Sequence, residues 1–128
     1  MEVRRDLLYT STHEWVLNKN GIARIGITDY AQDSLTDIVY AELPEINKYY
    51  KKGDVIATLE SVKSVAEIYA PVSGKVIAIN EKLEDDPAII NESPYDDGWI
   101  AEIEMESEEE LDDLMNANEY EEMISKDL

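Results

Sequence analysis

Few side chains in this sequence can carry chemistry of their own. The 128 residues include no cysteine and one histidine, His13. Without a thiol the chain cannot form a disulfide, a cysteine metal site or a thiol nucleophile, and one imidazole cannot supply a two-histidine zinc motif. A Ser-His-Asp triad would have to use His13, which stands close to Trp15 and which we expect to make structural hydrogen bonds.

The most informative stretch runs from Gly53 to Gly74 and centres on Lys63. Two β-type runs, 55–59 and 66–70, approach this lysine from both sides. The centre is nearly symmetric, because a valine and then a glutamate stand on each side of Lys63 and Ser64, namely Val62 and Val65, then Glu60 and Glu67. This pattern predicts a β-hairpin with Lys63 at its exposed apex.

A lysine at a hairpin apex is suited to enzymatic acylation. Its amine projects from a rigid scaffold into a modifying enzyme, and a lysine amine can lose its proton. The alternative is a lysine that only makes an exposed turn soluble. Spacing alone does not decide between the two roles and, taken by itself, favours the second.

The elements that must position this hairpin are predicted to be mostly short strands. Runs of β-branched and apolar residues bounded by Gly, Pro, Asn or Asp cover residues 22–27, 38–43, 54–59, 66–69 and 74–79. Residues 28–35 predict a capped helical turn that packs Ala31 and Leu35 inward. The turn-rich residues 80–98 predict a loop. Strands at this spacing favour a mainly β fold, a small antiparallel sandwich or flattened barrel.

The C-terminal segment is acidic and predicts helices. Residues 101–128 hold 12 Asp or Glu and one Lys, a net −11 of the −19 carried by the whole chain. Ser107 followed by Glu110 fits a capping box, and apolar residues then recur at helical spacing, so a helix is expected near 108–116. A second helix near 119–125, capped by Asn116 or Asn118, would bury Tyr120, Met123 and Ile124. We interpret the charge run as a solvated helix face.

The overall charge excludes some partners. With 30 acidic and 11 basic residues, the chain is repelled by nucleic acids and by anionic membranes, and basic protein surfaces are the better partners. No secretion signal and no run of about 18 apolar residues is evident. We expect a monomeric single domain over residues 1–128, with an acidic helical segment at about 107–128, in the cytoplasm or in a mitochondrial matrix.

The hairpin sequence ESVKSV, followed by APVSG, resembles the lipoyl-attachment hairpin of the glycine cleavage system H protein family. Further family motifs occur in order along almost the whole chain, in residues 9–15, 25–32, 37–44 and 91–99 and at Leu111, Leu114 and Tyr120. The chain departs from the family pattern at three places. A turn glycine is replaced by Thr36, no glycine occurs in residues 45–48, and Ser34 stands where some members carry a histidine near the cofactor cleft.

The resemblance implies a carrier without catalysis of its own, built on a barrel-sandwich fold of the lipoyl/biotinyl type. Lys63 would hold lipoate as an amide, attached by a lipoate ligase or by an octanoyltransferase and lipoyl synthase. A pyridoxal-phosphate glycine decarboxylase (P protein) would load an aminomethyl group on the arm. A tetrahydrofolate-dependent aminomethyltransferase (T protein) would unload it, and dihydrolipoamide dehydrogenase (L protein) would reoxidise the arm.

The resemblance also implies a set of residues around the arm. The aminomethyl group hydrolyses in water, so the loaded arm must be sheltered in a cleft. Matching positions are Thr12, Glu14 and Glu67, of which Glu67, beside the tip, is the expected partner of the protonated amine. Glu60 and Glu67 are also expected recognition marks for the lipoate-attaching enzyme, on a hairpin tip formed with Val62 and Ser64.

Other readings remain open on the sequence. A biotin carrier centres on AMKM, and the lipoyl domain of a 2-oxoacid dehydrogenase reads DKA at its tip, neither of which occurs around Lys63. An H-like protein that relays lipoyl or octanoyl groups to other enzymes, without a complete glycine cleavage system, keeps the same fold, and the sequence does not exclude this role. A non-carrier acidic interaction module would leave Lys63 unmodified.

Overall fold

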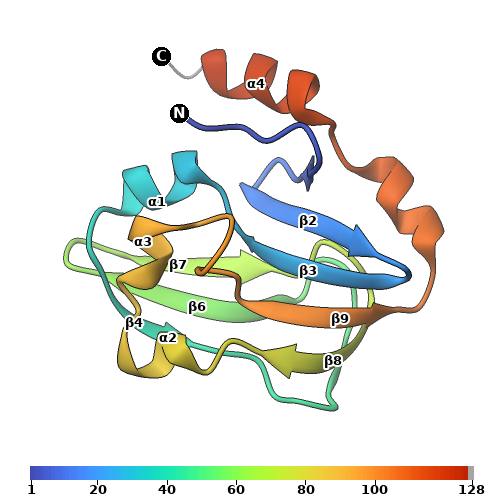
Figure 1. The fold of residues 1–128 in the computed structure, drawn as a ribbon, viewed down its shortest axis with the longest axis horizontal. Helices are drawn as coiled ribbons and strands as arrows, with labels where there is room; N and C mark the ends of the chain where they lie inside the picture. Colours follow the sequence, from blue (N-terminus) through green and yellow to red (C-terminus); the bar gives the residue numbers. More distant parts are fainter. Residues whose placement is uncertain (127–128) are drawn as a thin grey trace.

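Two antiparallel β-sheets form the body of the protein (Figure 1). The computed structural model describes residues 1–126; residues 127 and 128, the end of the expected segment 107–128, lie outside it. The six-stranded sheet has, in spatial order, β1 (Leu8–Tyr9), β2 (Glu14–Lys19), β3 (Ile22–Ile27), β9 (Ala101–Met105), β8 (Gly74–Ile79) and β5 (Tyr49–Tyr50). The three-stranded sheet has β4 (Ile38–Glu42), β6 (Val55–Ser61) and β7 (Val65–Tyr69).

The main core draws on both sheets. Ile25, Val76 and Ile103 from the larger sheet are buried, together with Leu59 and Ile68 from the smaller one. Packing two sheets through their apolar sides is the solution expected for strands that alternate inward and outward residues. The predicted mainly β, sandwich-like fold is confirmed. The five strands expected from the sequence are all present, and β1, β2, β5 and β9 are additional.

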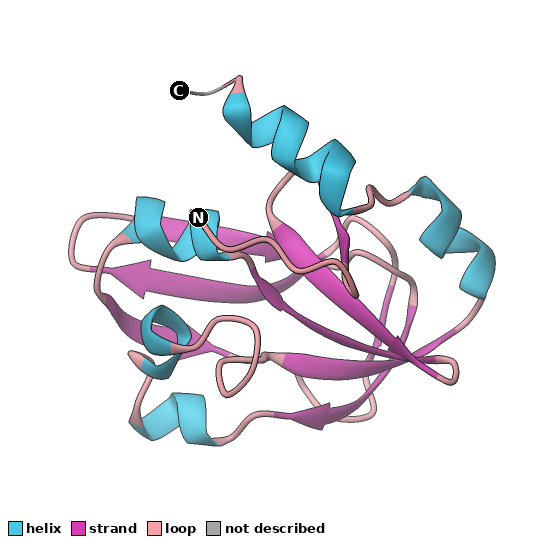
Figure 2. Ribbon diagram, turned by 45° about the horizontal axis from the view of Figure 1, so that its top comes forward, coloured by secondary structure: helices cyan, strands magenta, loops and turns pink. Residues whose placement is uncertain are grey.

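Short helices cover the ends of the sheets (Figure 2). The predicted helical turn is α1 (Asp29–Leu35), whose N-cap Thr28 accepts a hydrogen bond from the Ala31 amide. The prediction of a loop over residues 80–98 was wrong in part, because this region contains α2 (Lys82–Asp85) and α3 (Ile89–Glu92). Each of these single turns carries one fully buried residue, Leu83 or Ile90, into the main core. No helix described within residues 1–126 is long and apolar enough to cross a membrane.

Of the two helices predicted in the C-terminal segment, the first differs from the prediction and the second agrees with it. The α-helix expected near 108–116 is a 3-10 helix, η1 (Glu108–Asp113), and no capping box forms. The reason is that the Glu110 carboxylate accepts hydrogen bonds from the backbone and hydroxyl of Ser73, at 2.7 and 3.0 Å. The second helix is confirmed as α4 (Ala117–Ser125), with a complete capping box between Asn116 and Glu119.

A second apolar cluster attaches α4 to the larger sheet. The rings of Tyr9 and Tyr120 stack with centroids 4.5 Å apart, and both rings are fully buried. Ile124 is buried as expected, while Met123 is only partly buried. The hydroxyl of Tyr120 shares hydrogen bonds of 2.7 Å with His13 Nδ1 and with the Thr28 hydroxyl. The structural hydrogen bonding expected of His13 is therefore confirmed.

Two of the positions that lack a family glycine have backbone conformations that favour glycine. Thr36 has φ 62° and ψ −150°, and Asn47 has φ 74°. Asparagine tolerates a positive φ, whereas a β-branched threonine in this region is strained. Thr36 is held there by its neighbours, since its carbonyl accepts from Asn91 Nδ2 at 2.7 Å and its amide donates to the Gln32 carbonyl.

We predict that Thr36→Gly stabilises the protein by about 1 kcal/mol, because relief of the strain exceeds the added flexibility of the unfolded chain. Urea unfolding followed by tryptophan fluorescence measures this as a higher midpoint at an unchanged slope. Asn47→Gly is the matched control and should change the midpoint less. A Thr36→Gly midpoint at or below that of the parent protein would contradict the assignment of strain to Thr36.

Candidate functional site

The β6–β7 hairpin places Lys63 at its apex. Its strands pair Glu60 with Val65 and Thr58 with Glu67, so the turn consists of residues 62–64. The hairpin extends to the left end of the molecule in Figure 1, where Lys63 is exposed. The predicted position of this lysine at an exposed hairpin tip is confirmed.

Ser61 and Asp37 hold the tip in one shape. The Ser61 hydroxyl accepts hydrogen bonds from the amides of Lys63 and Ser64, at 3.3 and 3.1 Å, and the Ser61 amide donates to the Ser64 carbonyl at 2.8 Å. The Val62 amide donates to the Asp37 carbonyl at 3.0 Å. Neither residue was singled out from the sequence, although a serine before a tight turn is a known signal for such side-chain to backbone bonds.

The glutamates near the tip share one face of the hairpin. Cross-strand partners lie on the same side of a sheet, so Glu60, paired with Val65, and Glu67, paired with Thr58, are on the outer face. Both glutamates are exposed, as are Val62 and Val65. This face is accessible to a modifying enzyme that approaches Lys63.

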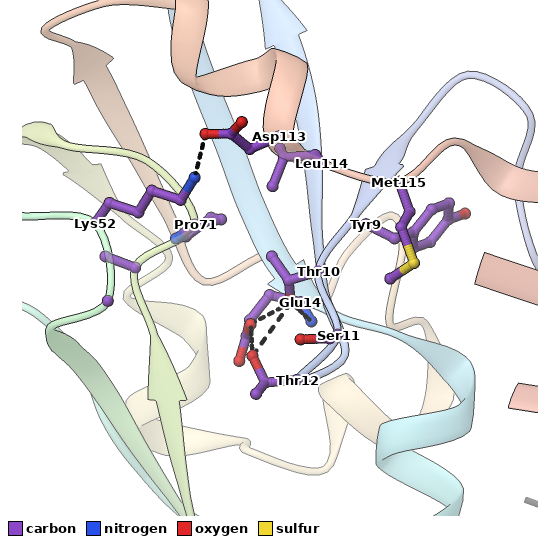
Figure 3. A pocket seen from close by; sticks show the side chains of 12 residues that line it. Tyr9, Thr10, Ser11, Thr12, Glu14, Lys52, Pro71, Asp113, Leu114 and Met115 are labelled. Carbon is purple, nitrogen blue, oxygen red and sulfur yellow. Dashed lines mark hydrogen bonds and ion pairs between the residues drawn. The ribbon is translucent and has the colours of Figure 1, made fainter. Parts of the chain in front are cut away.

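A pocket of about 310 Å³ lies at the opposite end of β7 (Figure 3). It is bounded by the β1–β2 loop, the turn before β6, the end of β7 and the chain that follows η1. Thr10, Thr12 and Glu14 are on one side, and Ala70, Pro71, Leu114 and Met115 contribute apolar walls. Glu67 is not among the lining residues, so the structure brings together only two of the three predicted cleft residues, Thr12 and Glu14.

Glu14 is a buried carboxylate, only 1% exposed. Its Oε1 accepts hydrogen bonds from the hydroxyls of Thr10 and Thr12, the latter at 2.5 Å, and its Oε2 accepts a longer one of 3.3 Å from the Tyr69 amide. Burial raises the pKa of Glu14 above its usual value, and these hydrogen bonds to the ionised form oppose the rise. Thr10 was not predicted as part of the site.

The arrangement is suited to a small cationic group. Oε1 of Glu14 is already satisfied by two hydroxyls, whereas Oε2 has one long hydrogen bond and can accept another from an ammonium. The apolar walls next to it suit a short alkyl chain. Within residues 1–126 no group of three or more His, Cys, Asp or Glu side chains is placed to hold a metal ion.

The tip and the pocket are connected by a single strand. Tyr69, whose amide contacts Glu14, ends the strand that begins with Val65 just after the tip. Four steps along a β-strand span about 13 Å. A group on a long flexible arm at Lys63 can therefore reach the pocket by folding back along β7.

Comparisons with known proteins agree on one family. The sequence profile of the glycine cleavage H-protein family matches residues 7–127. The chain is 54% identical to glycine cleavage system H protein 4 of Aquifex aeolicus, over 97% of this chain and 72% of that protein. It is 53% identical to the H protein of Oceanobacillus iheyensis, over 97% and 98%.

A solved structure supports the same assignment. The crystal structure of a glycine cleavage system H protein from Mycobacterium marinum superposes with a TM-score of 0.88 at 32% identity, over 96% of this chain and 99% of that one. The match in fold thus covers both sheets and the helices around them. With the sequence matches, it shows that this chain belongs to the glycine cleavage H-protein family.

Proposed function

We propose that this protein is the lipoyl carrier of a glycine cleavage system, with lipoate attached as an amide to Lys63. The observation that carries the proposal is the Lys63 tip, exposed at the end of a hairpin and fixed by Ser61 and Asp37. Bound lipoate supplies the dithiol chemistry that a chain without cysteine lacks. The chain itself presents the lysine, shelters the loaded group and performs no catalysis.

The partners follow from that role. The decarboxylase (P protein), the aminomethyltransferase (T protein) and dihydrolipoamide dehydrogenase (L protein) each need access to the end of the arm. Attachment requires a lipoate ligase, or an octanoyltransferase with lipoyl synthase, which would approach the outer face that carries Glu60 and Glu67. The net charge of −19 favours partners with basic docking surfaces.

Sheltering is assigned to the pocket at Glu14. The end of β7, about 13 Å from its start, is within reach of a lysine side chain extended by an eight-carbon acyl chain. Thr12 and Glu14 would then hold the protonated amine, with the apolar walls of the pocket excluding water from the reactive carbon. Glu14 is better placed for this than Glu67, because Glu67 projects from the outer face of the hairpin.

The first prediction concerns attachment. Intact-mass spectrometry of the protein from lipoate-replete cells should show one lipoyl amide, and Lys63→Arg should remove it. The lipoylated protein should support exchange of CO2 with glycine by purified glycine decarboxylase. An unmodified native protein would contradict the carrier function, and lipoylation without exchange would assign the protein to the lipoyl or octanoyl relay role.

The second prediction concerns the shape of the tip. Ser61→Ala removes the acceptor for two turn amides, so the lysine becomes less well positioned and the rate of lipoylation should fall by about tenfold. Ser64→Ala is the matched control for the shape of the turn, because within the described turn Ser64 takes part through its backbone amide and carbonyl and not through its hydroxyl. Equal rates for both variants would show that Ser61 does not organise the tip.

The third prediction concerns pH. Glu14 must be ionised to hold a cation, so sheltering is complete above its raised pKa and is lost as the pH falls through that value. Glu14→Gln supplies the unsheltered rate at each pH. The rate of aminomethyl loss should therefore be slower in the parent protein than in Glu14→Gln at neutral pH, and the two rates should converge in acid.

The variant Glu67→Ala tests which of the two carboxylates, Glu14 or Glu67, holds the amine of the loaded arm. With the amine held at Glu14, this variant should lose the aminomethyl group at nearly the parent rate at neutral pH. A loss as fast as that of Glu14→Gln would move the amine to Glu67, as expected from the sequence alone.

A further inference from the structure

Three charged side chains line the pocket within the described chain, namely Glu14, Lys52 and Asp113. Lys52 and Asp113 form an ion pair, with Nζ 3.0 Å from the carboxylate. Figure 3 shows this pair above the pocket and Glu14 with its two threonines below it. The pocket thus contains two carboxylates and one ammonium, which give a net charge of −1 when Glu14 is ionised.

Hydrogen bonds fix the backbone on both sides of this ion pair. The Lys52 amide donates to the Ser73 hydroxyl at 2.8 Å, and that hydroxyl donates in turn to the Glu110 carboxylate at 3.0 Å. Beyond Asp113, Met115 exchanges two backbone hydrogen bonds of 2.8 Å with Tyr9. Asp113 therefore lies on a segment that is anchored at both ends, opposite a lysine whose main chain is anchored to the same segment.

The lysine is a potential competitor for Glu14. Both side chains line the same pocket, and charges that face one pocket attract each other more strongly than charges separated by bulk water. The lysine side chain has four flexible carbons and a compact ammonium with three donors. If Asp113 did not hold it, Glu14 would be the remaining carboxylate among the pocket's lining residues. An ammonium from the chain itself would then occupy the acceptor that the loaded arm needs.

We propose that Asp113 is a positioning residue that holds the Lys52 ammonium away from Glu14 and so keeps the pocket selective for one external cation, the amine of the loaded arm. This inference rests on the proposed carrier function. It gives one residue of the acidic C-terminal segment a role in the pocket. Asp113 is exposed and Lys52 is partly exposed, with side-chain exposures of 71% and 35%, so the ion pair contributes little to stability and its variants are expected to fold.

The test uses Asp113→Asn and the double variant Asp113→Asn/Lys52→Met. In the unmodified protein, NMR titration of the Glu14 carboxyl should show its pKa lowered by about one unit in Asp113→Asn, because the released ammonium pairs with it. The double variant removes that ammonium and should restore the parent titration. An unchanged Glu14 titration in Asp113→Asn would overturn the proposal, and so would a lowered value that Lys52→Met fails to restore.

The lipoylated and loaded proteins supply the second readout. Asp113→Asn should lose the aminomethyl group about tenfold faster at neutral pH, the factor that corresponds to one pKa unit, and the double variant should return to the parent rate. Parent-like loss in Asp113→Asn despite a lowered Glu14 pKa would also overturn the proposal. A native protein with no lipoyl group would instead overturn the carrier function, while the titration of Glu14 would still report on the ion pair.

Discussion

Burial of the Glu14 carboxylate where the two sheets meet is the constraint on which the site depends. Glu14 begins β2 in the larger sheet, and its side chain accepts from the Tyr69 amide at the end of the smaller one. A buried charge without partners is costly. Hydrogen bonds from the Thr10 and Thr12 hydroxyls and from the Tyr69 amide compensate for the lost hydration of the Glu14 carboxylate. Because Thr10 and Thr12 lie in the β1–β2 loop, these bonds also fix the conformation of that loop. The same loop is attached to α4 by His13, whose amide donates to the Thr10 carbonyl and whose Nδ1 is hydrogen-bonded to the Tyr120 hydroxyl.

The acidic C-terminal segment has a structural role as well as a high charge. Glu110 is bonded to Ser73, Asp113 pairs with Lys52, and Glu121 pairs with Arg5 at 2.8 Å. Glu119 closes the capping box of α4. The segment therefore cannot be described only as a solvated helix face, because several of its carboxylates attach it to the turns between strands and to the N-terminal segment. The same contacts place Leu114 and Met115 in the wall of the pocket.

The features predicted correctly from the sequence are those with local signals. The hairpin around Lys63, the capped helix α1 and the capped helix α4 all depend on residues close together in the chain. The features that were missed depend on distant partners. Glu110 forms hydrogen bonds with Ser73, 37 residues away, in place of the local capping box. The sequence around Lys52 does not indicate a role, and its contact with Asp113 is visible only in the structure. Thr12 and Glu14 were expected from the family resemblance, but the burial of Glu14 required the packed structure.

In this account the hairpin tip presents Lys63 for attachment of the arm, and the pocket at Glu14 shelters the loaded end of the arm. One chain therefore needs both an exposed lysine and a buried carboxylate. NMR of the loaded protein with an isotope-labelled aminomethyl group tests this account most directly, because nuclear Overhauser contacts report which protons lie near the arm. The account predicts contacts from the labelled methylene to the methyl groups of Thr12 and Met115, which line the pocket. Contacts confined to Val62 and Val65 at the tip would contradict it.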